Sequence, residues 1–290
     1  MVRVSRSEEA GGSPEWGGRL PWCIYLAVAA VALSCAAPLE PRIVSVPQAN
    51  VRAAGYISDI SDYDVAATTI ARLVEQEVGM AQFPVAFRFF PTPQAFEAML
   101  LQAGYDAQLA RETAQEMRAV AGYRAVLLNE SKLVALSWPD RVALLAHEFT
   151  HSLQYELGGG RRGASDQWLR EGFADWVSIR VIERLRAHRR GDLRRQRIEK
   201  FREAGSRISP LSQMVTFPQW VALSVRTEGS SYLQAFLAVD FLIERHGMRA
   251  IVDYFSRFAR SDDRLANFRA TFGEDLAAFE KALASRLRRL

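Results

Sequence analysis

The 290-residue sequence is poor in cysteine: it has two, Cys23 and Cys35, and both lie within the first 37 residues. A mature domain that begins after them contains no thiol, which excludes a disulfide framework and a cysteine nucleophile. Histidine is scarce as well, with four residues in the whole chain. The sequence shows no internal repeat and no recognisable cofactor loop, so neither feature contributes to a prediction of function.

A strong charge imbalance is also missing. The 37 basic and 33 acidic residues leave a formal net charge of +4, which by itself indicates no class of partner. Apolar residues make up 49% of the chain, enough for one large domain or for two small lobes around a cleft.

The one long apolar run extends from Leu20 to Ala37 and is interrupted only by Pro21 and Ser34. It is short for a membrane-spanning helix of about 20 residues, and it ends in small residues as a signal peptide does. Cleavage after Ala36 or Ala37, lipidation of Cys35, and retention as an anchor through residues 20–37 remain open. Each alternative predicts an exported protein, periplasmic or extracellular, in which residues 1–37 are a signal peptide or anchor and proline-rich residues 38–50 are a tether.

Two of the four histidines occur in one five-residue motif, His147-Glu148-Phe149-Thr150-His151. Histidines four residues apart on a helix project from the same face, where one Zn²⁺ ion can take a nitrogen from each. Glu148 lies beside them and can remove a proton from a water molecule at the open position of the metal. The motif therefore predicts a zinc site that carries its own general base.

The residues around the motif predict a helix over 139–157. Apolar residues recur there at helical spacing, namely Val142, Leu145, Ala146, Phe149 and Leu153. Pro139 and Asp140 are typical of a helix start, and the glycine run at 158–160 ends the helix. Both histidines thus lie in the middle of a helix.

The third ligand is expected on a second helix, in the segment Trp168-Leu169-Arg170-Glu171-Gly172-Phe173-Ala174-Asp175-Trp176. Glu171 and Asp175 are four residues apart and share a helix face. Glu171 can bind the metal while Asp175 accepts the free ring N–H of a ligand histidine. The small residues Gly172 and Ala174 allow neighbouring helices to approach closely around the metal.

With these residues the chain resembles the gluzincin metallopeptidases, the thermolysin-like clan, and in particular the small bacterial "peptidase MA-like" proteins. The resemblance includes a later segment that begins Ser231-Tyr232-Leu233-Gln234-Ala235 and reaches Leu242 and Gly247. It implies an α+β, zincin-like fold with a small N-terminal sheet lobe, a zinc helix and a mainly helical C-terminal lobe. The domain would cover residues 51–290, with lobes of about 51–157 and 158–290.

Strands are expected at 84–90 and at 119–128, and short helices at 65–78, 94–102 and 106–117. The resemblance implies an edge strand just before the zinc helix, in which Ala121, Gly122 and Tyr123 offer backbone groups to an extended substrate. An interior strand without that role is the alternative.

Tyr232 is the candidate oxyanion donor, because it opens a predicted helix at 232–245 and could reach the zinc. Its alternative is a structural tyrosine that packs on Trp168 or Trp176. His246 is interpreted as a helix cap beside Gly247, with a second proton donor as the alternative.

A basic segment, residues 184–202, contains eight arginines and one lysine against only two acidic residues, Asp192 and Glu199. A helix of this composition can bind an anionic surface of the cell envelope, or it can be a solvated protrusion. It lacks the interleaved aromatic residues that nucleic-acid stacking requires, so no nucleic-acid partner is predicted.

These patterns together predict a zinc-dependent peptidase of the cell envelope, an endopeptidase in the first interpretation, with one Zn²⁺ per chain. One alternative is a peptidase-like zinc protein with a non-catalytic binding or assembly role. A purely structural zinc site would normally have four protein ligands and no need of Glu148. Neither the substrate nor the oligomeric state follows from the sequence.

Overall fold

The computed structural model describes residues 40–205 and 208–290. The predicted signal peptide or anchor at 1–37 lies outside the described residues. Within them no helix is both long and apolar enough to span a membrane.

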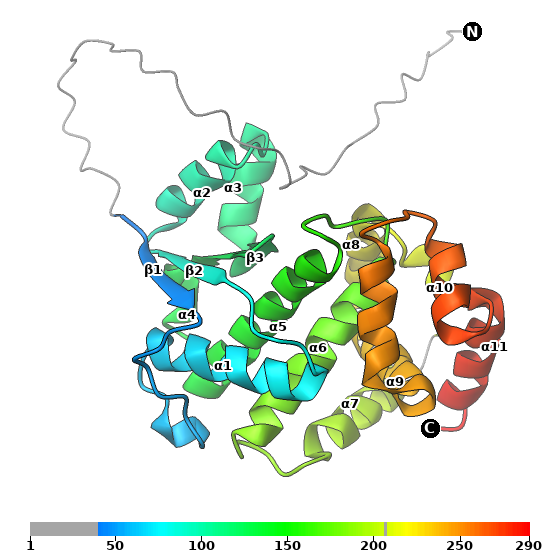
Figure 1. Cartoon of the computed structure of the whole chain (residues 1–290). Coiled ribbons are helices and arrows are strands. Elements are labelled where there is room, and N and C mark those ends of the chain that lie inside the picture. Colours follow the sequence, from blue (N-terminus) through cyan, green and yellow to red (C-terminus); the bar gives the residue numbers. More distant parts are fainter. Residues whose placement is uncertain (1–39, 206–207) are drawn as a thin grey trace, which may run out of the picture.

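The fold is mixed α and β, with one small sheet and a large helical part (Figure 1). The sheet consists of β1 (Arg42–Val46), β2 (Val85–Phe90), β3 (Ala119–Gly122) and β4 (Ala125–Asn129), in the order β1-β2-β4-β3. β2 and β4 are parallel, and both outer pairs are antiparallel. The predicted α+β class is therefore confirmed at this coarse level.

Two expectations about these strands are wrong. Residues 119–128 form a β3–β4 hairpin rather than one strand, because Tyr123 and Arg124 turn the chain back. The predicted tether at 38–50 contains β1, whose Val44 and Val46 are buried. Alternation of side chains along β1 buries one face and exposes the other, which is a property of an edge strand rather than of a linker.

The two faces of the sheet pack on different helices. Phe87, Phe89, Val126 and Leu128 point into the main apolar core with α1 (Tyr63–Val78) and α5 (Trp138–Leu157). On the other face, Phe90 and Leu127 belong to a second cluster with α2 (Pro93–Gln102) and α3 (Ala107–Glu116). The expected strand at 84–90 and the first three expected helices are confirmed to within a few residues.

β3 lies at the edge of the sheet, as the family resemblance implies, and it packs against α5; the alternative of an interior strand is wrong. Between the sheet and α5 the chain makes only the one-turn helix α4 (Glu130–Leu133). The edge strand and the helix that carries His147 and His151 are therefore neighbours in space as well as in sequence.

The helical part begins with α5 and continues through α6 (Gln167–Arg184), α7 (Asp192–Glu203), α8 (Phe217–Arg226), α9 (Ser230–Arg257), α10 (Arg264–Phe272) and α11 (Leu276–Leu287). α6 packs on α5 and on α9 (Figure 1). α9 is interrupted at Gly247, whose φ of 78° and ψ of 163° are not helical. One apolar core extends from β1 to α11, so the two predicted lobes share it.

Candidate metal centre

α5 carries the motif as predicted. Ser137 caps its first turn, and the helix ends at Leu157 before Gly158. Its five predicted apolar residues are all buried, and Phe149 packs on Phe83 and Phe87. This packing fixes the rotation of α5 about its axis and turns His147 and His151 toward α6.

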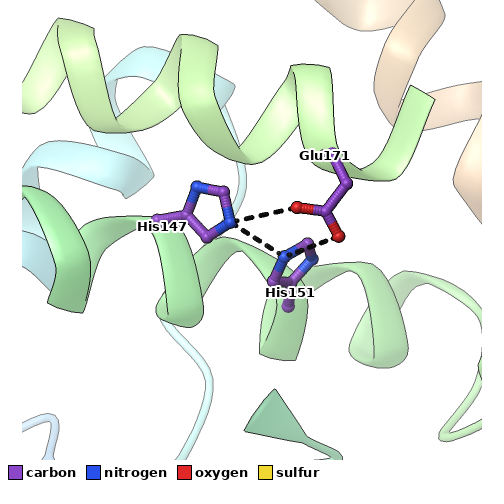
Figure 2. A group of neighbouring side chains, drawn as sticks. All are labelled: His147, His151 and Glu171. Carbon is purple, nitrogen blue, oxygen red and sulfur yellow. Dashed lines mark hydrogen bonds and ion pairs between the residues drawn. The ribbon is translucent and has the colours of Figure 1, made fainter. Parts of the chain in front are cut away.

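Three predicted ligands come together between the two helices, as Figure 2 shows. The Nε2 atoms of His147 and His151 are 3.1 Å apart. Glu171 Oε2 lies 3.4 Å from His147 Nε2, and Glu171 Oε1 lies 3.6 Å from His151 Nε2. His147, His151 and Glu171 thus form a group that could hold a metal ion.

The separations fit a small tetrahedral ion. Ligand atoms about 2.0–2.1 Å from a tetrahedral zinc ion lie about 3.3–3.4 Å from one another. The three measured separations, from 3.1 to 3.6 Å, bracket that value. The group therefore has both the donor types and the spacing of a three-ligand zinc site.

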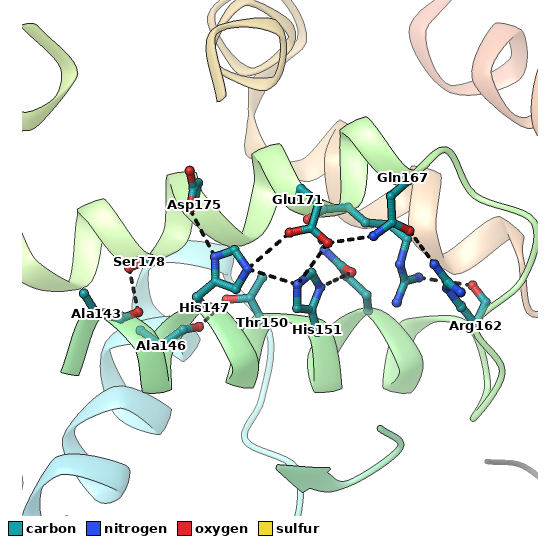
Figure 3. A network of polar contacts seen from close by, with 12 residues as sticks. Ala143, Ala146, His147, Thr150, His151, Arg162, Gln167, Glu171, Asp175 and Ser178 are labelled. Atoms are coloured by element: carbon teal, nitrogen blue, oxygen red, sulfur yellow. Dashed lines mark hydrogen bonds and ion pairs between the residues drawn. The ribbon is translucent and has the colours of Figure 1, made fainter. Parts of the chain in front are cut away.

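Hydrogen bonds on the far side of each ring set the tautomers of both histidines (Figure 3). His147 Nδ1 lies 3.1 Å from Asp175 Oδ1, and an ionised carboxylate can only accept, so Nδ1 donates. His151 Nδ1 lies 3.1 Å from Gln154 Oε1, and Gln154 Nε2 donates to the carbonyl of Arg170 at 2.9 Å. When neutral, each ring therefore presents an Nε2 lone pair to the centre.

The centre strongly favours a positive charge. Burial alone lowers the pKa of His147, but the hydrogen bonds to Asp175 and Glu171 outweigh it and raise that pKa well above its ordinary value. Burial raises the pKa of Glu171, but the imidazoles of His151 and His147 outweigh it and lower that pKa strongly. Two imidazole nitrogens and a carboxylate converge here, an environment that a metal cation satisfies.

Glu148 lies one residue beyond His147, half-buried beside the group. Burial is the largest influence on its carboxyl and raises its pKa. Among the residues that the structure describes, none donates a hydrogen bond to this carboxylate or forms an ion pair with it. A half-buried carboxylate without a protein partner is chemically available to a water molecule.

Tyr232 lies in the first turn of α9. Its ring contacts Trp220 of α8, with ring centroids 4.6 Å apart in an edge-to-face arrangement. The alternative role for Tyr232, packing on Trp168 or Trp176, is therefore wrong about the tryptophan that it contacts. Burial, together with the negative charges of Glu171, Asp175 and Glu148, raises the pKa of Tyr232 to about 12.

The other predicted residues are not members of the group. Ala121 and Gly122 belong to edge strand β3, and Tyr123 lies in the turn that follows. His246 contacts Glu274 at 3.3 Å and packs on Phe272, away from the metal ligands. His188 is exposed.

Three residues of the site were not predicted from the sequence. Gln154 orients His151, Gln167 donates to Glu171 Oε1 at 2.7 Å, and Arg197 pairs with Asp175 at 3.4 Å. Gln154 is three residues from His151, and Gln167 is four from Glu171, so helical spacing carries a signal for both. Arg197 comes from α7, and nothing in the sequence relates it to Asp175.

The basic segment at 184–202 packs on the protein rather than protruding. α7 contacts α9 and buries Phe201. Several of its cations pair within the molecule: Arg184 with Glu77, Arg194 with Asp240, Arg195 with Asp192, Arg197 with Asp175, and Arg202 with Glu199. The segment therefore does not protrude, although Arg184, Arg195 and Arg202 are exposed to solvent. Binding to an anionic surface stays a prediction.

Comparison of the chain with protein-family models, with curated proteins and with solved structures gave no significant match.

Proposed function

We propose that this chain is a zinc-dependent peptidase. The observation that carries the proposal is the convergence of two imidazole lone pairs and the Glu171 carboxylate at zinc-ligand separations, with the unpartnered Glu148 carboxylate beside them. A purely structural site would use a fourth protein ligand. Among the described residues only these three form such a group.

The residues divide into holders of the metal and residues that act on the substrate. His147, His151 and Glu171 would hold one Zn²⁺, and Asp175 and Gln154 keep the two rings in the tautomers that expose Nε2. Zinc bound there would supply Lewis-acid chemistry, polarising a carbonyl group and increasing the acidity of water. The fit of the residues to zinc rests on their donor types and separations.

Glu148 acts as the general base in this proposal. Its carboxylate removes a proton from the attacking water and later delivers that proton to the nitrogen of the leaving amine. Burial raises the pKa of this carboxyl, so it is a better proton acceptor than an exposed glutamate.

Tyr232 donates a hydrogen bond to the oxyanion that develops on the scissile carbonyl. A pKa of about 12 keeps its hydroxyl protonated across the neutral range, as a donor must be. Contact with Trp220 restricts the orientation of the ring.

Edge strand β3 offers the expected place for an extended substrate. Its free edge faces away from β4, and β3 packs on the zinc helix. A peptide that adds to this edge would be held by main-chain hydrogen bonds, which do not depend on its sequence.

The proposal is tested by incubating the zinc-loaded full chain with a diverse peptide library and detecting new termini by mass spectrometry. Cleavage is expected, loss of cleavage on chelation, and recovery when zinc is added back. His147→Ala should abolish both zinc binding and cleavage, whereas His246→Ala, outside the metal group, should keep both. A folded, zinc-loaded chain that cuts nothing would favour the non-catalytic binding role.

A further inference from the structure

The loop between α5 and α6, residues 158–165, is fixed against the end of α9. Arg161 donates to the carbonyl of Phe258 at 2.5 Å, and the backbone N–H of Ala164 donates to Asp262 at 3.2 Å. Gly163 has a φ of 64°, and a Cβ at this position would lie 2.7 Å from the side chain of Phe258. The loop therefore presents its side chains in a preformed arrangement.

Two arginines at this loop have no anionic partner. Arg170 is only 3% exposed, and it donates to the carbonyl of Arg162 and to Ser165 Oγ, both at 3.3 Å. Arg162 is half-buried and donates to Gln167 Oε1. In the part of the chain that the structure describes, neither guanidinium forms an ion pair, although buried charges are normally paired.

Arg170 remains a cation at neutral pH. Burial, and then repulsion by Arg162, lowers its pKa to about 10, which is still far above neutrality. The ring of Tyr155, 5.4 Å from its guanidinium carbon, supplies only a cation–π contact. The protein thus maintains a buried positive charge at Arg170, whose guanidinium contacts the backbone carbonyl of Arg162.

The pair lies next to the metal group. One carboxamide separates Arg162 from the ligand Glu171, because Gln167 accepts from Arg162 and donates to Glu171 Oε1 at 2.7 Å (Figure 3). Two hydrogen bonds and an amide span at most about 8 Å, which corresponds to no more than about two residues of extended peptide. The loop also touches the β3–β4 turn, since a Cβ on Gly160 would lie 3.4 Å from the Tyr123 ring.

The charges around the site leave these two cations uncompensated. Glu171 and Glu148 together balance a divalent metal ion, and Asp175 is paired with Arg197. Arg161 is paired with Asp262, and Arg124 with Glu156. A ligand that brings one negative charge to Arg162 would compensate one of these two cations.

We propose that Arg162, supported by Arg170, binds a carboxylate of the substrate about two residues from the scissile bond; this inference rests on the proposed function. The carboxylate is either the C-terminal group of a peptide or the side chain of an aspartate or glutamate. Arginine binds either group through two parallel charge-assisted hydrogen bonds. Such a subsite would restrict the peptidase to acidic sequences or to bonds near a free C-terminus.

Binding is measured by calorimetry on the zinc-loaded full chain carrying Glu148→Gln, so that no peptide is cut during the titration. The probes are an acetylated tetra-alanine peptide with a free C-terminal carboxylate, its C-terminal amide, and amidated versions with one aspartate or one asparagine. A carboxylate probe should bind at least about tenfold more tightly than its neutral counterpart. Which of the two pairs shows the difference identifies the source of the carboxylate.

Arg162→Gln should abolish this preference, and it changes a half-buried side chain, so folding should persist. Arg249→Gln is the matched control: its exposed guanidinium is already paired with Asp253, outside the loop, and the preference should remain. Equal binding of charged and neutral probes, no binding of any probe at millimolar concentration, or a preference that survives Arg162→Gln would overturn the inference. If the wild type cuts neutral amidated peptides as readily as charged ones, the subsite is contradicted and the proposed peptidase function is supported. If the charged probes bind selectively but the wild type cuts no peptide, the subsite is supported and the peptidase function is contradicted.

Discussion

In the proposed metal centre, single side chains orient the two histidines. Asp175 follows Glu171 by one helical turn, and this spacing alone predicts that it can reach a ligand histidine. The structure shows the contact, at 3.1 Å from His147 Nδ1. Arg197 could not be predicted in the same way, because its position relative to Asp175 depends on how α7 packs.

Asp175→Asn should weaken zinc binding by about 10- to 100-fold, because the amide is a poorer acceptor for the His147 N–H and carries no charge. Competition with a chromophoric chelator measures the affinity. Asp253→Asn, at an exposed ion pair on α9, serves as the control and should leave zinc affinity unchanged. An affinity that is the same in Asp175→Asn and in the wild type would contradict the role given to Asp175.

Tyr232→Phe removes a hydroxyl and keeps the ring that packs on Trp220. We expect kcat to fall by about 10²- to 10³-fold, with zinc affinity preserved, because the lost hydrogen bond acts on the developing oxyanion. Steady-state kinetics on a peptide identified from the library provide the measurement, with Tyr56→Phe as an exposed control. A normal kcat in Tyr232→Phe would assign the residue to packing alone.

Asp166 gives the protein a pH-dependent stability separate from the metal site. It is fully buried between Arg264, at 2.8 Å, and Tyr254, at 3.4 Å. Burial outweighs the favourable effect of Arg264 and raises its pKa from 3.8 to about 6. The folded state thus holds the proton more tightly than the unfolded state, so this stabilisation is complete below about pH 4 and is lost as the pH rises through 6.

Between pH 4 and pH 7 the contribution of Asp166 to the free energy of unfolding should fall by on the order of 2–3 kcal/mol in the wild type. This fall should be absent in Asp166→Asn. Urea unfolding of both proteins at a series of pH values between 4 and 7 isolates the effect as the difference between them. Asp262→Asn, at an exposed carboxylate, should retain the wild-type dependence. Parallel curves for the wild type and Asp166→Asn would show that Asp166 does not titrate in this range.

Helix α6, which carries Glu171, packs closely on α9, which carries Tyr232, and the two helices lie close together at Gly172. A Cβ on Gly172 would lie 2.2 Å from the carbonyl oxygen of Ala235 in α9 and 2.8 Å from Val239. Backbone atoms cannot move aside as a flexible side chain can. The expectation that Gly172 allows close helix approach is met, and the close partner is α9.

Gly172→Ala should therefore push α9 away from α6 and destabilise the fold, by about 2–3 kcal/mol or a fall in Tm of roughly 5–10 °C. Gly55→Ala is the matched control, because no atom lies within 4 Å of the added methyl group and the substitution should be tolerated. Thermal unfolding followed by circular dichroism checks both. Equal stability of the two variants would contradict the close-packing role of Gly172.

Elements with a strong periodic pattern could be predicted, and those with weak turn signals could not. The apolar stripe and the capping residues of α5 define it from sequence alone. The β3–β4 turn has no glycine or asparagine, and Arg124 adopts a φ of 53° with its guanidinium held by Glu156 at 2.7 and 2.8 Å. β1 was missed because the prolines around it indicated a tether.

For the whole molecule, the metal group was predictable because its ligands lie on two helices and have local spacing. The strand order β1-β2-β4-β3 was not, because a parallel pair between distant segments leaves no local pattern. The carboxylate subsite at Arg162 was equally hidden, since it depends on which arginines lack a partner once the chain has folded. Pairing of charges is a property of the tertiary structure, whereas ligand spacing is a property of the helix.

The most direct test of the central claim is the rate of peptide cleavage by wild type and by Glu148→Gln at matched zinc content. Glu148 holds no protein group in place among the described residues, so the substitution should keep the fold and one zinc ion per chain. We expect cleavage to fall by at least about 10²-fold in Glu148→Gln, because the general base is lost. Equal rates at equal zinc content would contradict the proposed mechanism, and the absence of zinc from the wild type would contradict the metal centre itself.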